Sequence, residues 1–464
     1  MIYRIFSYWL CCVSVYYLET SAQAKPQIFI HVGSAKIKVS TLAVPQFRFV
    51  SKSNRLKKRA IVLKTKLHTA IAHNLKYSSF LQVLSSAAFL ENSNLLDSKP
   101  YPYSKSGFRF KKWSQIGANF LIRGDVFFKK NKFVFQVFVY NVNKAKQLFA
   151  KEYSLTYARE IELLADTFSN DLVYNITGKP GVYLSKVVAS YRSPSRYKEI
   201  YTMDWDGKNK KRITFHRNLA ISPSWSWNKK KLLYTAFPFH VKARQRNPDL
   251  FIYDIKTKKR KILSYFKGVN SGGVFVPGDE RVILSRTNSR GGSYLVEIFA
   301  KNGKLKRYLL GKSSTSLNVE PAVSPDGKWL AYSSNKVGRE MLYVMNLKNK
   351  KSKRLTFAGR YNSSPSWSPD SKTIVFAGYS KGHYDIFSIS KDGNKLKRLT
   401  SIRAKGGRWA NNEDPSFSPD GQMVVFSSDK TGFKHLYIMR ASDGGGLRAI
   451  TSGAGSYERP KWSR

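Results

Sequence analysis

Ser324-Pro325-Asp326-Gly327, preceded by Val323 and followed by the apolar run Trp329–Ser333, is the stretch that decides the fold, because it recurs along the chain. The full tetrapeptide returns at Ser418–Gly421, and variants of it stand at Ser226–Lys229, Val276–Asp279 and Ser368–Ser371. The residues before the motif mark six copies, spaced by 50, 48, 44, 50 and 45 residues: Trp225, Phe275, Val323, Trp367, Phe417 and Trp462. A near-constant period of this length predicts a repeat architecture.

Each full copy is predicted to form four strands. After the motif come one apolar strand such as Trp329–Ser333, a second such as Leu342–Asn346, and a short one that ends at Arg354–Thr356. Tight turns suited to the positive φ of glycine join the third and fourth strands, at Asp206-Gly207, Asn302-Gly303 and Asp392-Gly393. Four-stranded units of about 45 residues are typical of a β-propeller, with a linear solenoid as the alternative.

The two ends of the repeat region favour a closed ring over a solenoid. The sixth copy stops at Trp462–Arg464, before its second strand, and Lys186–Tyr191 has the character of the missing strand. A ring completed by its own beginning leaves no open sheet edge. We therefore expect an all-β six-bladed propeller with strand exchange at the seam.

The region before the repeats is predicted to be a small α/β domain. Apolar positions three or four residues apart predict helices over Ala60–Lys76 and Ile161–Ile176. Strands are expected at Gln27–Val32, Thr41–Val50, Phe80–Leu84, Asn119–Val126, Lys132–Tyr140 and Gln147–Leu155. The junction Gly178-Lys179-Pro180-Gly181 follows the second helix, so we expect domains at residues 25–178 and 179–464.

The first 24 residues read as a secretory signal peptide. Arg4 precedes an apolar stretch, and Ala22-Gln23-Ala24 suits a signal peptidase. A membrane anchor is the alternative, but the stretch is short and Glu19 interrupts it. Cys11 and Cys12 both lie here, and Leu10 argues against a lipoprotein signal, so the mature chain would have no thiol for a disulfide or for catalysis. We expect an exported, soluble, monomeric product, cleaved near Ala24.

The chain is strongly basic, with 81 Lys and Arg against 29 Asp and Glu and a net charge of +52 over 464 residues. Such a charge keeps open the binding of anionic polymers such as lipopolysaccharide or acidic glycans. The basic clusters Lys208–Arg212, Lys229–Lys231 and Lys256–Lys261 fall at predicted turns, without interleaved aromatic residues. Export argues against nucleic acid as the partner.

Catalytic, metal and cofactor motifs are weak or absent in the sequence, so we expect no enzyme, no cofactor and no metal. His68 and His73 are five residues apart, not four as in a helical zinc pair, and no Gly-x-Ser-x-Gly elbow occurs. Asp204-x-Asp206-Gly207 lacks the later ligands of a calcium loop.

The repeats, of the form Asn-x-x-Pro-x-aromatic-Ser-Pro-Asp-Gly, resemble the propeller repeat shared by the TolB family and the prolyl-oligopeptidase-like peptidases. The order of the parts resembles the TolB family over the whole mature chain. These parts are the signal peptide, the α/β domain, the Gly-Lys-Pro-Gly junction, a first blade with Tyr201–Gly207 and Thr214–Arg217, and the Pro-x-Trp-Ser ending at 460–463.

The resemblance implies a non-enzymatic periplasmic component of the Tol-Pal system that links TolA to the peptidoglycan-associated lipoprotein Pal during outer-membrane constriction in cell division. Other outer-membrane proteins near peptidoglycan are further expected partners. A propeller that binds a different envelope protein, or a small ligand in its channel, is the remaining alternative.

The same resemblance implies two sets of binding residues. TolA would bind the segment 25–36, with Lys25, Pro26, Gln27, Ile28, Phe29 and Ile30 as its first residues. Pal would bind loops just before the innermost strands, where Asn and Asp before Pro are also ordinary turn formers. The Pal-facing candidates are Val269, Asn270, Gly272, Asn318, Val319, Glu320, Asn362, Ser363, Ser364, Glu413 and Asp414. The chain departs from the family pattern at Val269, where relatives can have His, and at Pro277-Gly278-Asp279.

Overall fold

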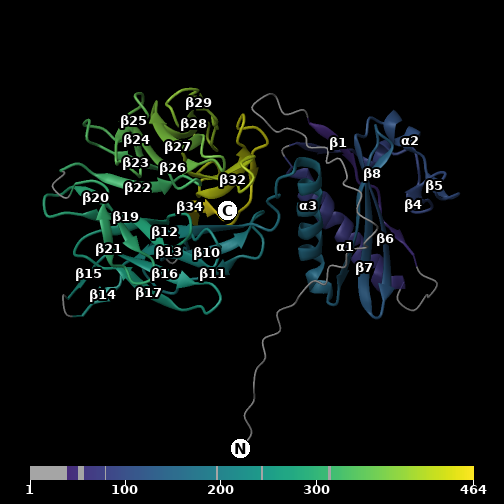
Figure 1. Cartoon of the computed structure of the whole chain (residues 1–464), viewed down its shortest axis with the longest axis horizontal. Coiled ribbons are helices and arrows are strands. Elements are labelled where there is room, and N and C mark those ends of the chain that lie inside the picture. The colour runs from purple at the N-terminus through teal and green to yellow at the C-terminus, as the bar shows by residue number, and fades with distance from the viewer. Residues whose placement is uncertain (1–38, 51–56, 79, 195–196, 242–243, 312–314) are drawn as a thin grey trace, which may run out of the picture. The chain divides into compact units, whose positions relative to one another are not determined.

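A computed structural model describes residues 39–50, 57–78, 80–194, 197–241, 244–311 and 315–464 (Figure 1). Internal contacts divide the chain into two units, between Leu184 and Ser185. The expected signal peptide, the strand at 27–32 and the TolA-binding segment lie outside the described residues, and the expected domain limits stay a prediction. No helix in the described ranges is both long and apolar enough to span a membrane.

The first unit is a mixed sheet covered by two helices. The sheet order is β3 (Leu81–Val83), β1 (Ser40–Ala43), β6 (Phe120–Lys129), β7 (Lys132–Asn141) and β8 (Lys146–Leu155), and β2 (Arg48–Phe49) also pairs with β6. Helices α1 (Lys57–Lys76) and α3 (Ile161–Thr177) pack against each other, and each contacts the sheet. The stripe buried by α1 includes Leu63, Leu67, Ile71 and Leu75, which confirms its periodicity.

Two details of this unit differ from the expectation. The single strand expected over 41–50 is split into β1 and β2, because Pro45 lies between them and has no N–H to donate to a ladder. The stretch between the expected strands at 80–84 and 119–126, for which no element was expected, contains short elements: η1 (Ser86–Ala88), β4 (Asp97–Pro100), β5 (Gly107–Phe108) and α2 (Phe110–Gln115). Strands β4 and β5 form a small parallel pair of their own.

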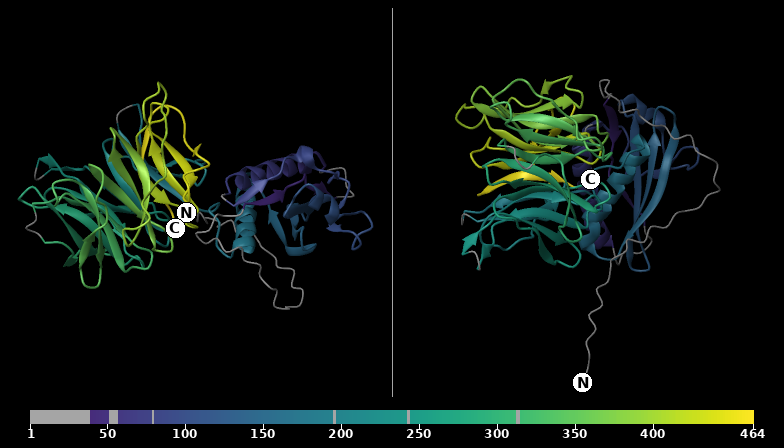
Figure 2. Two further views of the ribbon diagram at one scale, coloured as in Figure 1. Left: turned by 90° about the horizontal axis from the view of Figure 1, so that it is seen from above. Right: turned by 60° about the vertical axis from the view of Figure 1, so that its left-hand side comes forward.

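The second unit is a ring of six four-stranded sheets (Figures 1 and 2). Strands β12, β18, β22, β26, β30 and β34 each contact the next, and β34 contacts β12, so the ring is closed and the solenoid is ruled out. The blades, from inner to outer strand, are β12 (Ala220–Trp225), β13 (Lys231–Ala236), β16 (Asp249–Asp254), β17 (Arg260–Ser264); β18 (Asn270–Phe275), β19 (Arg281–Thr287), β20 (Ser293–Phe299), β21 (Leu305–Tyr308); β22 (Asn318–Val323), β23 (Trp329–Ser334), β24 (Met341–Asn346), β25 (Ser352–Arg354); β26 (Tyr361–Trp367), β27 (Thr373–Ser380), β28 (His383–Ser390), β29 (Lys397–Arg398); β30 (Asn412–Phe417), β31 (Met423–Ser428), β32 (His435–Arg440), β33 (Arg448–Ala449); and the seam blade β34 (Ser456–Trp462), β9 (Lys186–Arg192), β10 (Lys198–Asp204), β11 (Lys211–Arg212).

The seam blade confirms the predicted strand exchange. Its innermost strand β34 pairs antiparallel with β9, so that Trp462 lies opposite Val187. The Trp462 indole N–H donates to Ser185 Oγ (2.7 Å), and the backbone N–H of Lys186 donates to Ser463 Oγ (2.9 Å). These contacts join residues far apart in the sequence and leave no unpaired edge between the first and last blades.

The Ser-Pro-Asp-Gly motif closes the turn between the first and second strands of a blade. In the variant at 368–371, Ser368 Oγ donates to Asp370 Oδ1 (2.6 Å) and accepts the N–H of Thr373 (2.9 Å). The N–H of Lys372 donates to the same carboxylate (3.1 Å). Equivalent bonds recur in the copies at 324–327 and 418–421. The motif is therefore a structural turn.

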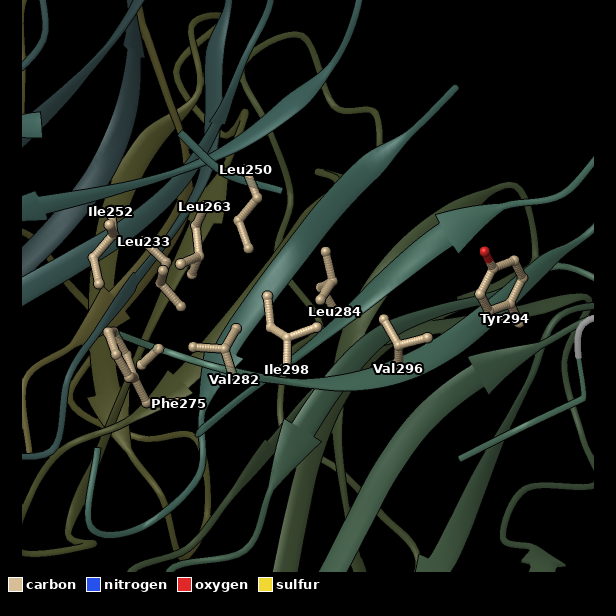
Figure 3. Packing of buried hydrophobic residues seen from close by; sticks show 11 residues of the cluster. Leu233, Leu250, Ile252, Leu263, Phe275, Val282, Leu284, Tyr294, Val296 and Ile298 are labelled. Atoms are coloured by element: carbon tan, nitrogen blue, oxygen red, sulfur yellow. The ribbon is translucent and has the colours of Figure 1, made fainter. Parts of the chain in front are cut away.

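Apolar side chains fill the space between neighbouring blades (Figure 3). Between the β12 and β18 blades, Leu233 and Leu250 pack with Val282, Val296 and Ile298. All five side chains are 0% exposed. Fully burying one such side chain stabilises the fold by about 1.5–3 kcal/mol relative to leaving it exposed. The repeat thus places one face of each blade against the next around the ring.

Antiparallel strands give the propeller two distinct faces. The six innermost strands begin on one face, where each second strand also turns into the third and each outermost strand leads to the next blade. We call this the mouth face. The opposite face, which we call the turn face, holds the Ser-Pro-Asp-Gly turns and the expected turns at 206–207, 302–303 and 392–393, each of which joins a third strand to a fourth. One addition was not predicted: the hairpin β14 (Phe239–His240) and β15 (Gln245–Arg246), inserted on the mouth face between β13 and β16.

Candidate functional site: the mouth face of the propeller

Each innermost strand bends at its third or fourth residue, where one residue has a positive φ of 53–64° and the ladder shifts register. A β-bulge of this kind re-aims a side chain. The six residues concerned all line one cavity inside the ring, with about 50 Å³ of space for water-sized groups: Ser222, Gly272, Glu320, Ser364, Asp414 and Arg459. We call this space the upper channel.

Four of these six side chains form a hydrogen-bonded network across four blades. Ser364 donates its backbone N–H to Glu320 Oε2 (2.6 Å) and its hydroxyl to Asp414 Oδ1 (2.8 Å). Arg459 donates its backbone N–H to Asp414 Oδ2 (3.1 Å) and a guanidinium N–H to Glu320 Oε1 (3.0 Å). The channel mouth is therefore cross-linked by its own polar groups.

Charge pairing holds this network ionised. Burial would raise the pKa of Asp414, but the positive charge of Arg459 and the hydrogen bond from Ser364 outweigh it and lower that pKa. Burial would lower the pKa of Arg459, but Asp414 and Glu320 outweigh it and raise that pKa. Two carboxylates and one guanidinium thus stabilise one another at the start of the channel.

The structure separates the predicted Pal-facing residues into two groups. Gly272, Glu320, Ser364 and Asp414 line the upper channel. Val269 lies in the loop just before β18. The others lie within the first three residues of the innermost strands: Asn270, Asn318, Val319, Asn362, Ser363 and Glu413. Of this second group Val269 is 37% exposed, whereas Glu413 is partly buried and forms an ion pair with Lys434.

The three predicted asparagines are buried, and their side-chain amides hydrogen-bond to backbone carbonyls of nearby loops. Asn270 is 0% exposed, and its amide donates to the carbonyls of Phe266 (2.7 Å) and Gly268 (3.0 Å). Asn318 donates in the same way to the carbonyl of Ser293 (2.8 Å), and Asn362 to that of Ala358 (2.9 Å). These side chains shape the loops of the mouth face from beneath and offer a partner little surface.

Exposed apolar side chains, which the sequence analysis did not single out, gather in the loops of this face. Phe215 is 62% exposed, Phe357 64% and Phe433 52%. Tyr197, Phe239, Val241, Tyr265, Phe266, Leu317 and Val337 are also exposed there. Exposed apolar side chains that form a contiguous patch on one face are typical of an interaction surface.

Two of these aromatic rings are held by the same local sequence. In Arg212-Ile213-Thr214-Phe215 the threonine hydroxyl accepts the N–H of Ile200 (2.8 Å), and Arg212 lies 4.4 Å from the centre of the Phe215 ring. Arg354-Leu355-Thr356-Phe357 repeats both contacts, at 3.0 and 4.1 Å. A recurring Arg-x-Thr followed by an aromatic residue is the signal that could have revealed these positions.

Among the described residues there is no group of three or more His, Cys, Asp and Glu side chains arranged to hold a metal ion. The predicted hairpin at Asp204–Gly207 is indeed a turn, in which the Gly207 N–H donates to the Asp204 carbonyl (2.9 Å). Asp204 also pairs with Lys186 (2.6 Å), which uses one of its carboxylate oxygens.

A closed ring of six four-stranded blades defines a β-propeller protein, here preceded by an α/β unit. Residues 29–148 match the TolB amino-terminal domain, and residues 173–464 match the TolB beta propeller domain. The chain belongs to the TolB family, as its repeats indicated.

Curated relatives and a solved structure agree with this assignment. A Tol-Pal system protein TolB of Desulfosudis oleivorans is 29% identical over 239 residues, which cover 52% of this chain and 51% of the relative. A Tol-Pal system protein TolB of Rickettsia prowazekii is 27% identical over 264 residues, which cover 55% of this chain and 54% of the relative. The chain spans about half the length of the curated relatives it matches. The crystal structure of TolB from Acinetobacter baumannii superposes with a TM-score of 0.74 at 22% identity, covers 92% of this chain and 97% of that one, and shows the same fold.

Proposed function

We propose that this chain is a non-enzymatic periplasmic component of the Tol-Pal system that bridges TolA and the lipoprotein Pal, and so supports outer-membrane constriction during cell division and the integrity of the envelope. The observation that carries the proposal is the set of exposed aromatic side chains around the channel mouth. Aromatic residues held in place by neighbouring groups are the usual energetic anchors of a protein–protein interface.

The polar network supports the same proposal. Because Glu320, Ser364, Asp414 and Arg459 satisfy one another, the centre of the face is preorganised, and a partner need not order it on binding. A docking partner would contact the exposed rings and the rim of this network. The Pal-facing candidates near the channel fit such a contact, and the buried asparagines would act only through loop shape.

The test uses the mature chain, residues 25–464, in a pull-down from the native envelope with washes at low and high salt. We expect a Pal-like lipoprotein to remain bound at high salt, since a shape-matched interface depends less on charge than a polyanion contact does. Removing residues 25–36 should abolish capture of TolA and leave capture of Pal intact. Loss of both partners, or of neither, would contradict the bridging role.

A second candidate function is the binding of anionic envelope polymers, and one observation favours it. The basic clusters Lys208–Arg212, Lys229–Lys231 and Lys256–Lys261 each lie in a connection on the turn face and run into the strand that follows it, which brings them to the same side of the ring. Their lysines are largely exposed. Anionic polymers recovered only at low salt, without a lipoprotein, would favour this function over the first.

A further inference from the structure

The channel has a second cavity nearer the turn face, which we call the lower channel. It holds about 90 Å³ of space for water-sized groups. Its lining comes from the ends of the innermost strands and includes Trp227, Ser366, Ser416, Lys461 and Arg464. Among the described residues that line it, Lys461 and Arg464 have basic side chains and none has an acidic one. Lys461 also lines the upper channel, together with Glu320, Asp414 and Arg459.

Arg464 has an incomplete set of partners. Its Nη2 donates to the carbonyl of Trp367 (3.0 Å), and its guanidinium lies 4.8 Å from the centre of a Trp227 ring. Its Nη1 is buried and has no hydrogen-bond partner among the described residues. Burial lowers the pKa of Arg464 to about 10, so the group is still charged at neutral pH. A buried donor on a charged group that has no acceptor is costly, which favours an anion beside it.

Lys461 adds a second basic side chain to the same cavity. In the described part of the chain its ammonium group makes no hydrogen bond and no close ion pair. Burial lowers the pKa of Lys461 and the charge of Arg464 lowers it further, while Asp414 and Glu320 oppose this from the upper channel.

Two hydroxyl groups complete the surroundings. Ser366 Oγ accepts the N–H of Phe417 (3.3 Å), and Ser416 Oγ accepts the N–H of Trp462 (3.1 Å). Each hydroxyl keeps its own proton to donate. The cavity thus offers a guanidinium N–H, an ammonium group and two hydroxyls, which are the donors that bind carboxylate and phosphate oxygens.

We propose that the lower channel binds a small oxyanion, a carboxylate or a phosphate, through Arg464 Nη1 and Lys461 Nζ. The site lies nearer the turn face, shares Lys461 with the upper channel, and does not depend on the partners proposed for the mouth face. An anion there would pair with the charged guanidinium of Arg464 and give its Nη1 an acceptor.

The test measures binding of inorganic phosphate, and in a second arm acetate, to the mature chain at constant ionic strength. Calorimetry should show one saturable site for at least one of the two anions, and a rise in Tm should follow its concentration. Arg464→Gln, which keeps the length and removes the charge, should weaken that binding at least tenfold. The arm that saturates identifies the source of the oxyanion.

A matched control is needed because a chain of charge +52 attracts anions everywhere. Arg354→Gln removes an arginine that also lies over an aromatic ring, but on the mouth face, and should leave the saturable site unchanged. Equal loss in both variants, or no saturable site for either anion, would overturn the proposal and leave water as the occupant of the cavity.

A second measurement covers the case in which Arg464→Gln does not fold. Crystals of the unaltered chain soaked in selenate should show an anomalous peak next to Arg464 and Lys461. Peaks only at surface lysines, with none in the lower channel, would also overturn the proposal.

Discussion

The two faces of the propeller are built from the same repeat, yet they carry different chemistry. On the mouth face, aromatic side chains such as Phe357 are exposed, and the charges at the centre pair with one another. On the turn face, the motif residues hydrogen-bond among themselves, and the exposed groups are mainly lysines. The repeated motif therefore builds the ring, and the loops between copies vary from blade to blade and expose the aromatic side chains.

The comparison of faces requires a closed ring, so the largest expected effect is at the seam. Trp462→Ala removes a side chain with 3% exposure and its bond to Ser185. We expect the free energy of unfolding to fall by about 3–5 kcal/mol, because a large cavity forms where the ends of the chain meet. Denaturant unfolding followed by circular dichroism measures it.

The control for the seam is Phe433→Ala, which removes an exposed ring on the mouth face. Its effect on stability should stay within about 0.5 kcal/mol. Comparable losses in the two variants would mean that the seam is not the feature that holds the ring closed.

The second prediction separates the faces by binding. Replacing Phe215 and Phe357 together by Ala should weaken Pal binding by about 2–3 kcal/mol, because each ring is a preorganised anchor. Titration calorimetry with purified Pal gives the dissociation constant. Leu396→Ala removes a 54% exposed apolar side chain from the turn face and should leave that constant unchanged. If Leu396→Ala weakened Pal binding more than the double replacement does, the interface would lie on the turn face and the proposal would be contradicted.

The third prediction concerns the network of the upper channel. Asp414→Asn should cost about 1–2 kcal/mol of stability, since Arg459 and Ser364 lose an ionised partner. The folded-state pKa of Asp414 is lowered, so its contribution is complete above the unfolded pKa of about 3.9 and is lost as pH falls through the folded value.

Unfolding free energies measured from pH 6 down to pH 2 test this sign. The Asp414→Asn variant should lose stability less steeply on the acid side than the unaltered chain does. Asp392→Asn, at a carboxylate whose side chain is 65% exposed, is the control and should follow the unaltered chain throughout. A steeper acid loss in Asp414→Asn would contradict the pairing with Arg459.

The features that could be predicted from the sequence are those encoded by motifs that recur along the chain. The Ser-Pro-Asp-Gly copies and the turn at Asp206-Gly207 specify local hydrogen bonds, so the blade count, the strands and the seam were predictable. Glu320, Ser364 and Asp414 were named from the resemblance to the TolB family, and each of them precedes a proline in the repeat.

Other features depend on contacts between distant residues. Arg459 also precedes a proline in the repeat, but the pairing of its side chain with Glu320, 139 positions away, is seen only in the closed ring. The burial of Asn270 depends on the loop folded over it, which cannot be seen in a list of turn-forming residues. The exposure of Phe357 could not be predicted from the sequence either, because an apolar residue after a strand is more often buried.

The smallest expected effect comes from surface charge, and it tests whether the basic residues of the two faces differ in function. Replacing Lys256, Lys258 and Lys259 on the turn face by Gln should weaken binding of dextran sulfate by less than about 1 kcal/mol at physiological salt, because exposed charges are screened. The dependence of binding on salt should become shallower, since fewer counterions are exchanged. The matched set Lys267, Arg290 and Lys381, exposed on the mouth face, should change this slope less. Equal changes in the two sets would mean that the charge of +52 acts as a uniform coat and that only the aromatic residues distinguish the faces.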